Sequence, residues 1–207
     1  PVRRRVCAAV GLVFQYPEDQ VFEETVYEDI AFGPRRLGKT PEETEKIVFR
    51  TAELMGLDKQ ILYKTPFELS GGTLRKVAIA GVLAMEPRVL VLDEPMAGLD
   101  PKSCDGLASL LLGLRECLEL SIVMVSHNLE YAAALSDKIY CMNGGRIVLS
   151  GSAREVFSDK AKLDEYGIGV LPAAAVAAEL SASGLKIEKT PLTAEELAGE
   201  ILKNYGK

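Results

Sequence analysis

The sequence predicts an α/β fold built on a parallel sheet, and three segments carry that prediction. Val89–Leu92 is an uninterrupted apolar run, which is typical of a parallel strand buried on both faces. Val10–Phe14 and Ser121–Val125 are further β-rich runs. Segments with helical patterns separate the three runs, as expected in an α/β protein.

Polar side chains follow each of these strands. Gln15 follows the first, Asp93 and Glu94 follow the second, and His127, the one histidine of the sequence, comes just after the third. Ligands of open α/β sheets bind beyond the carboxyl ends of the strands, where one acid can hold Mg²⁺ and another can orient or deprotonate a water. Each residue taken alone is also compatible with an ordinary polar turn, but their common position favours a site.

The composition restricts the classes of function. The 207 residues are 48% hydrophobic, which is enough for a sizeable core in one domain or in one domain with a subdomain. The formal charge of −6 argues against nucleic acid as the main partner. No apolar run has the length of a membrane span, and we expect no secretory signal at Pro1–Arg5. The four cysteines show no C-x-x-C spacing, so we expect reduced thiols in a cytosolic protein.

The segment Gly33–Thr40 reads G-P-R-R-L-G-K-T and satisfies the phosphate-loop pattern G-x-x-x-x-G-K-[ST]. That pattern cradles phosphates only when a strand precedes it, whereas Glu23–Phe32 has a helical pattern. Pro34 also removes one N–H group from the would-be cradle. Thr40 is better explained as the cap of a helix, with Pro41 in its first turn and Glu43 completing a capping box. The sequence therefore predicts a coincidental match.

Capping and turn signals place the remaining elements. Helices are expected at Pro41–Met55, Thr73–Met85, Asp100–Leu118, Ala153–Phe157 and Pro172–Ser183, and from Thr193 to about Lys203, where Thr193 and Glu196 form a capping box. A β-hairpin is expected at Ile139–Met142 and Arg146–Leu149. The segment Ser70-Gly71-Gly72 precedes the second of these helices, where it is either an anion seat or an ordinary N-cap.

Five short motifs occur in a fixed order: V-G-L-V-F-Q, L-S-G-G, V-L-V-L-D-E-P, A-G-L-D and S-H, at Val10–Gln15, Leu69–Gly72, Val89–Pro95, Ala97–Asp100 and Ser126–His127. In this order and spacing they resemble the ATP-binding-cassette ATPases over about Val10 to Phe157. Within that superfamily the chain is similar to the ATPase subunits of energy-coupling-factor transporters for vitamins and for cobalt or nickel. Gln15–Thr25, Asp29–Pro34 and Val77–Pro87 carry this similarity, and Leu171–Leu197 resembles the C-terminal extension of the same group.

The resemblance implies ATP and Mg²⁺ as cofactors. Asp93 is expected to hold Mg²⁺ largely through water, and Glu94 is expected to polarise the water that attacks the γ-phosphate. Gln15 would sense both Mg²⁺ and that water. His127 would contact the γ-phosphate and stabilise charge in the transition state.

The resemblance also implies two kinds of partner. Ser70, Gly71 and Gly72 would bind the γ-phosphate of a nucleotide held by a second ATPase subunit, identical or different, and Asp100 would lie at the interface between the two. The loop Gln15–Phe22 would contact a membrane coupling subunit. ATP would thus join two subunits, and hydrolysis would separate them to drive transport. The expected location is cytoplasmic and peripheral, on the inner face of the cell membrane.

The implied fold is a three-layer P-loop NTPase. Residues 1–30 and 86–158 would form the nucleotide-binding core, residues 31–85 an inserted helical subdomain, and residues 159–207 the C-terminal helical extension. In this family the phosphate loop lies well N-terminal to Gln15, so we expect an N-terminally shortened chain that binds ATP weakly when alone. Titration with Mg·ATP tests this expectation. Thr73 and Met96 are two milder departures, at positions where the family usually has Gln and Thr or Ser.

The sequence is compatible with more than one function. The chain is either a transport ATPase subunit or a non-catalytic partner that contributes only the signature face at Ser70–Gly72 and the membrane-facing loop. ATPase assays with Glu94→Gln discriminate between the two. A DNA-repair or chromosome-structure ATPase would need heptad arms or a basic face, and the sequence shows neither. A relative acting on ribosomes would be expected to carry two cassettes.

Overall fold

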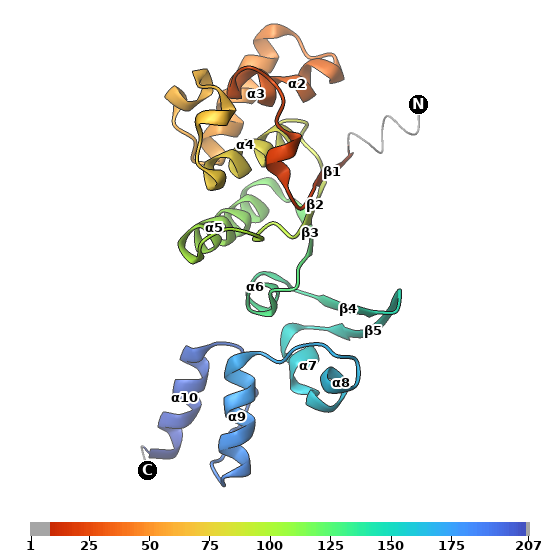
Figure 1. The fold of residues 1–207 in the computed structure, drawn as a ribbon, viewed down its shortest axis with the longest axis vertical. Coiled ribbons are helices and arrows are strands. Elements are labelled where there is room, and N and C mark those ends of the chain that lie inside the picture. The colour runs from red at the N-terminus through yellow and green to blue at the C-terminus, as the bar shows by residue number, and fades with distance from the viewer. Residues whose placement is uncertain (1–8, 206–207) are drawn as a thin grey trace. The chain divides into compact units, whose positions relative to one another are not determined.

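The computed structural model describes residues 9–205 and divides them into two units, one ending at Ser126 and one beginning at His127 (Figure 1). Within the described residues, a three-stranded parallel sheet lies in the first unit and a two-stranded antiparallel sheet in the second. The division expected from the sequence, with boundaries near residues 31, 86 and 159, stays a prediction.

The sheet of the first unit consists of β1 (Val10–Val13), β2 (Val89–Asp93) and β3 (Ser121–Val125), with β2 in the centre. All three strands run parallel, with Leu12 beside Val91 and Val91 beside Val123. The parallel sheet and the segments that form it are as predicted. Parallel pairing requires long crossovers between strands, and these crossovers contain the helices of the unit.

Only one face of this sheet is packed within the described chain. Val13, Leu90 and Leu92 point to that face and are at most 1% exposed. The other face carries Leu12 and Val123, which are 43% and 51% exposed, because neighbouring residues of a strand point to opposite faces. The apolar run of β2 had predicted burial on both faces, and its residues Val89 and Val91 are instead half-buried.

Three of the α-helices of the first unit begin and end within two residues of the predicted positions, but the helix predicted at Glu23–Phe32 begins three residues later and continues through Pro34 to Leu37. The α-helices are α2 (Val26–Leu37), α3 (Pro41–Leu54), α4 (Gly71–Leu83) and α5 (Pro101–Leu118), with the 3₁₀ helices η1 (Pro17–Gln20), η2 (Lys59–Tyr63) and η3 (Pro66–Glu68) between them. Helix α4 packs against β1, α2 and η1, and α2 also packs against α3. Ile30, Val48, Val77 and Ile79 are fully buried in this helical layer.

The coincidental phosphate-loop match is confirmed as part of a helix. Gly33–Leu37 forms the second half of α2, and Gly38 ends that helix with a φ of 89°. Thr40 caps α3, and its hydroxyl and the Glu43 carboxylate exchange the two hydrogen bonds of a capping box. No strand precedes the segment, so its N–H groups are not arranged to wrap phosphates.

The second unit contains a hairpin packed against short helices. Its elements are α6 (Leu129–Leu135), β4 (Ile139–Asn143), β5 (Arg146–Gly151), α7 (Ala153–Ser158), α8 (Lys160–Glu165), α9 (Pro172–Ala182) and α10 (Ala194–Tyr205). Gly144 and Gly145 have φ values of 56° and 75°, which is the hairpin turn predicted from the sequence. Phe157, Leu163 and Leu171 form a buried cluster that joins the hairpin to the helices.

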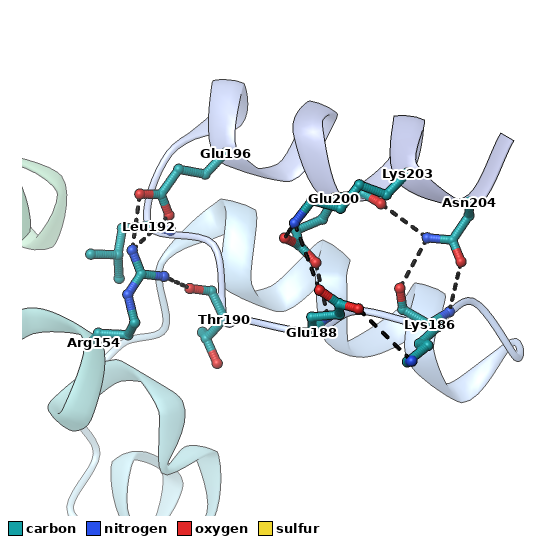
Figure 2. Close-up of polar contacts among 9 residues, drawn as sticks. All are labelled: Arg154, Lys186, Glu188, Thr190, Leu192, Glu196, Glu200, Lys203 and Asn204. Atoms are coloured by element: carbon teal, nitrogen blue, oxygen red, sulfur yellow. Dashed lines mark hydrogen bonds and ion pairs between the residues drawn. The ribbon is translucent and has the colours of Figure 1, made fainter. Parts of the chain in front are cut away.

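Polar contacts fix the last helix to the segment before it (Figure 2). Arg154 donates to the carbonyl of Thr190 and to the carboxylate of Glu196. The predicted capping box at α10 is half correct: Thr193 accepts from the Glu196 N–H at 3.2 Å, but the Glu196 carboxylate accepts from the N–H of Leu192 at 2.9 Å. The tail is therefore packed on its own unit.

No helix in the part of the chain that the structure describes is long and apolar enough to cross a bilayer.

Candidate functional site

Three of the predicted site residues lie at one edge of the parallel sheet. Val13 pairs with Leu92, so the chain passes beyond the sheet at Gln15 just where β2 ends in Asp93 and Glu94. Gln15 is exposed, and the two acids are half-buried. The structure thus brings an amide and two carboxylates to the carboxyl ends of adjacent strands, where α/β proteins bind ligands.

The backbone at Glu94 is unusual. Its φ is 46°, in the left-handed region that costs a residue with a side chain roughly 1–2 kcal/mol. Its N–H donates to the carbonyl of Val125 at 2.9 Å, which extends the β2–β3 ladder by one bond. Strained conformations of this kind concentrate at functional sites, because surrounding contacts must hold them. The sheet edge therefore fixes the backbone from which the Glu94 carboxylate extends.

The segment after Glu94 turns twice and ends in a capped helix. The N–H of Ala97 donates to the Glu94 carbonyl at 3.0 Å, and Gly98 has a φ of 73°. Asp100 caps α5 by accepting hydrogen bonds from the N–H of Ser103 at 3.1 Å and from its hydroxyl at 2.5 Å. These bonds stabilise the carboxylate and lower the pKa of Asp100.

Helix α4 begins at the predicted signature segment. Ser70 is its N-cap and accepts from the N–H of Thr73 at 3.4 Å, with the two hydroxyls 2.9 Å apart. The N–H groups of Gly71 and Gly72 lie in the first turn, where a helix offers no acceptor of its own. A Cβ on Gly71 would meet no atom within 4 Å, whereas one on Gly72 would lie 3.5 Å from the Ser103 hydroxyl, so there is space beside Gly71. The segment can therefore bind an anion.

A cavity of about 270 Å³ lies between the starts of α4 and α5. Its lining includes Ser70, Gly72, Arg75 and Lys76 from α4, and Lys102 and Ser103 from α5. The structure thus brings the signature segment next to the helix that Asp100 caps. Two helix N-termini and two lysines contribute positive charge around this cavity, and the Asp100 carboxylate that caps α5 contributes a negative charge.

Sequence reasoning missed the two lysines of the cavity. Lys102 had a detectable signal, because a cation in the first turn of a helix opposes the helix dipole and needs another reason to be there. Lys76 had none, since a lysine within a helix is ordinarily a solvated side chain.

The loop between Gln15 and Phe22 is held by hydrogen bonds at both ends, and exposed residues occur along it, interspersed with the buried Pro17 and Val21. The N–H of Phe14 donates to the Gln20 side chain at 3.0 Å, and the N–H of Phe22 donates to Asp29 at 3.0 Å. Asp29 is buried, and burial raises its pKa even though the backbone N–H groups of Phe22 and Glu23 act in the opposite direction. Tyr16 and Phe22 are 55% and 60% exposed, which suits a protein-binding surface.

His127 is exposed and is the second residue beyond β3, where the second unit begins. Its predicted convergence with Gln15, Asp93 and Glu94 stays a prediction.

The oxygen donors at the sheet edge suit Mg²⁺. A carboxylate and an amide oxygen, from Asp93 and Gln15, are ligands that Mg²⁺ accepts. In the described residues, no group of three or more His, Cys, Asp or Glu side chains could hold a metal ion. A Mg²⁺ ion at this edge would therefore take most of its ligands from phosphate oxygens and water, which agrees with the chemistry of Mg²⁺ sites that bind phosphates.

Three features together define an ATP-binding-cassette ATPase. They are a parallel sheet with two acids at its edge, a helix that starts at Ser-Gly-Gly, and a helix capped by Asp100. The family described as ABC transporter matches residues 2–97. The chain is 47% identical over 194 residues to the energy-coupling factor transporter ATP-binding protein EcfA2 of Caldanaerobacter subterraneus subsp. tengcongensis, covering 94% of this chain and 68% of that protein. It is 47% identical over 203 residues to EcfA2 of Enterococcus faecalis, covering 98% of this chain and 69% of that protein. The chain belongs to the family of energy-coupling factor transporter ATP-binding proteins, which are ABC ATPases.

A solved structure agrees with this assignment. It is cbiO1 from Clostridium perfringens, described as part of the ABC transporter complex cbiONQ, and it superimposes with a TM-score of 0.71 at 34% identity. The alignment covers 86% of this chain and 69% of cbiO1. The predicted fold class is therefore confirmed.

Proposed function

We propose that this chain is the subunit that binds and hydrolyses ATP to energise an energy-coupling-factor importer of a vitamin or of cobalt or nickel. The relatives named above are energy-coupling factor transporter ATP-binding proteins, and cbiO1 is described as part of the ABC transporter complex cbiONQ. The chain would act on the cytoplasmic side, peripheral to the inner face of the cell membrane. One observation carries the proposal: Gln15, Asp93 and Glu94 lie at one carboxyl edge of the sheet.

The sheet edge would perform the chemistry. Bound Mg·ATP supplies the γ-phosphoryl group that water attacks. Asp93 would hold the cation through water, and Gln15 would accept from waters of the same shell. Glu94 would orient the attacking water and draw its proton, and the fixed backbone at this residue limits the conformational freedom of its carboxylate. His127 would donate to the γ-phosphate oxygens and stabilise their charge.

The cavity between α4 and α5 would receive the γ-phosphate of a nucleotide held by a second ATPase subunit. The cavity is lined by Gly72 in the first turn of α4, the Ser70 hydroxyl and two lysines, and these groups suit an anion. Asp100, next to that cavity, would lie at the interface of the two subunits, whether these are copies of one chain or different chains. ATP would therefore hold the pair together until hydrolysis.

The exposed loop Gln15–Phe22 would contact the membrane coupling subunit. Tyr16 and Phe22 present aromatic surface there, and the loop begins at the residue proposed to sense Mg²⁺. A movement of the partner at this loop would reach Gln15 directly along the chain.

The test is ATP hydrolysis by the transporter assembled with its partner subunits. Glu94→Gln keeps the shape of the side chain but removes its basicity, so we expect turnover to fall about 10²-fold or more. Glu119→Gln is the matched control, because Glu119 also has a left-handed backbone, with a φ of 49°, and is exposed away from the sheet edge. It should leave turnover unchanged. Unchanged turnover in Glu94→Gln would instead favour a non-catalytic partner that contributes only its signature face.

A further inference from the structure

Arg75 is a buried arginine on α4 whose guanidinium contacts two other segments of the first unit. The residue is 4% exposed. Its Nη1 donates to the carbonyl of Pro95 at 3.0 Å and to that of Ala97 at 2.6 Å. Its Nη2 donates to both carboxylate oxygens of Glu18 at 3.3 Å. One planar group therefore joins main-chain carbonyls to a carboxylate.

The contacted segments are the ones that the proposed function assigns to chemistry and to partner binding. Pro95 and Ala97 belong to the turn that begins at Glu94, and the Ala97 N–H bonds back to the Glu94 carbonyl. Glu18 lies in η1, within the exposed loop that starts at Gln15. Arg75 itself is one turn beyond the signature segment that begins α4.

The geometry makes the two contacts interdependent. The guanidinium is rigid and planar, so a displacement of Glu18 that carries Nη2 with it also moves Nη1 against the Pro95 and Ala97 carbonyls. The Nε atom has no hydrogen-bond partner within the described chain, so the orientation of the group depends on these two sets of acceptors. The Glu18 side chain is about one third exposed, whereas that of Arg75 is almost fully buried. The loop is therefore the end of this connection that a partner can reach.

We propose that Arg75 is a positioning residue that couples the partner-facing loop to the catalytic turn. A membrane subunit that moves Glu18 would shift the Arg75 guanidinium and, through the Pro95 and Ala97 carbonyls, the turn from which Glu94 extends. Arg75 also lines the cavity between α4 and α5, but both of its Nη atoms are engaged by Pro95, Ala97 and Glu18, and in this scheme it acts only through those groups. The inference rests on the proposed function, since it requires Glu94 to act on the attacking water.

The scheme predicts a particular kinetic signature. Displacing a catalytic group by about 1 Å costs up to about 10²-fold in rate, while nucleotide binding at other contacts is retained. In the assembled transporter, Arg75→Lys should therefore lower kcat for ATP hydrolysis about tenfold with KM for ATP within about twofold of wild type. Lysine presents its donors from one nitrogen and cannot reproduce the two separate nitrogens with which the guanidinium reaches the two acceptor sets. Arg75→Gln, which also removes the charge, should be slower still.

A double-mutant cycle tests the connection itself. Glu18→Gln should also lower kcat at unchanged KM, and the Glu18→Gln/Arg75→Lys double variant should be no slower than the slower single variant, because the two changes break one connection. Arg50→Gln is the control, since Arg50 makes an exposed ion pair with Glu86 at 3.4 Å and should leave kinetics unchanged. Thermal unfolding of each variant separates a kinetic effect from loss of folded protein.

The outcomes are distinct. Any of three results would overturn the coupling role. The first is that the losses of kcat in the two single variants multiply in the double variant. The others are that loss of folded protein accounts for the whole loss of kcat, or that folded Arg75→Lys has wild-type kcat. If Glu94→Gln also retains wild-type turnover, the proposed function itself has failed. If Glu94→Gln is inactive while Arg75→Lys turns over normally, only this inference has failed.

Discussion

Substitution of Gly11 by alanine is the most direct test of how the sheet packs against α4. It lies in β1 on the packed face, and a Cβ there would be 2.4 Å from Cγ1 of Val82 and 3.2 Å from Cγ of Pro87. Carbon atoms in contact are separated by about 3.5–4.0 Å, so β1 and α4 would have to move apart by more than about 1 Å. Val82 cannot turn away easily, because a β-branched side chain in a helix has one strongly preferred rotamer. We therefore expect Gly11→Ala to destabilise the fold by about 1–3 kcal/mol.

The assay is urea unfolding of the purified protein, with Gly113→Ala as the matched control. Gly113 lies in the interior of α5, and a Cβ there would meet no atom within 4 Å. The same chemical change at this exposed helical site should raise the free energy of unfolding by about 0.5–1 kcal/mol. The free energy of unfolding should therefore fall in Gly11→Ala and rise in Gly113→Ala. A Gly11→Ala protein as stable as wild type would show that β1 and α4 are not packed as described.

Two further predictions concern ionisable groups. Burial raises the pKa of Asp29 in the folded state, so the folded protein binds this proton more tightly than the unfolded chain, and stability falls as pH rises through the interval between the two pKa values. Asp29→Asn should therefore gain stability relative to wild type as pH rises from about 4 to 7, measured by urea unfolding; a relative loss over that interval would contradict the assignment. Arg154→Met should cost about 1 kcal/mol or less by thermal unfolding, because its ion pair with Glu196 is partly exposed. A loss of several kcal/mol would mean that Arg154 holds the whole tail in place.

Short sequence patterns were sufficient to predict much of the fold. Thr40, Pro41 and Glu43 predicted the start of α3 because capping is decided by residues three positions apart. The turn at Gly144 and Gly145 was predictable for a similar reason, since its φ values favour glycine. The position of Asp93 and Glu94 at the sheet edge followed from the end of an apolar run.

Long-range contacts were beyond such reasoning. Arg75 stands in a helix rich in small and apolar residues, and its carboxylate partner Glu18 is 57 residues away. Burial of a charge depends on which segments the fold brings around it, and no local pattern shows that. The left-handed backbone of Glu94 was also unpredictable, because glycine is the residue that usually signals such a conformation.

Partial errors had related causes. The apolar run of β2 predicted two buried faces, but the exposure of a strand depends on what covers the sheet. At α10, the Thr193 and Glu196 spacing predicted a reciprocal cap, whereas the Glu196 carboxylate has competing donors in Leu192 and Arg154. The 3₁₀ helices between Lys59 and Glu68 were not anticipated, since single-turn helices have little periodicity to detect.

In the proposed function, the sheet edge of one subunit and the signature face of another share one nucleotide. Light scattering of the ATPase subunits, purified without the membrane partner, measures this directly. Because the single chain is expected to bind ATP weakly, Mg·ATP is raised to a saturating concentration. With Glu94→Gln the molar mass should then rise to that of a stable pair, because ATP joins the subunits and is not hydrolysed. A mass that stays at the value for a single subunit at saturation would show that ATP does not join them.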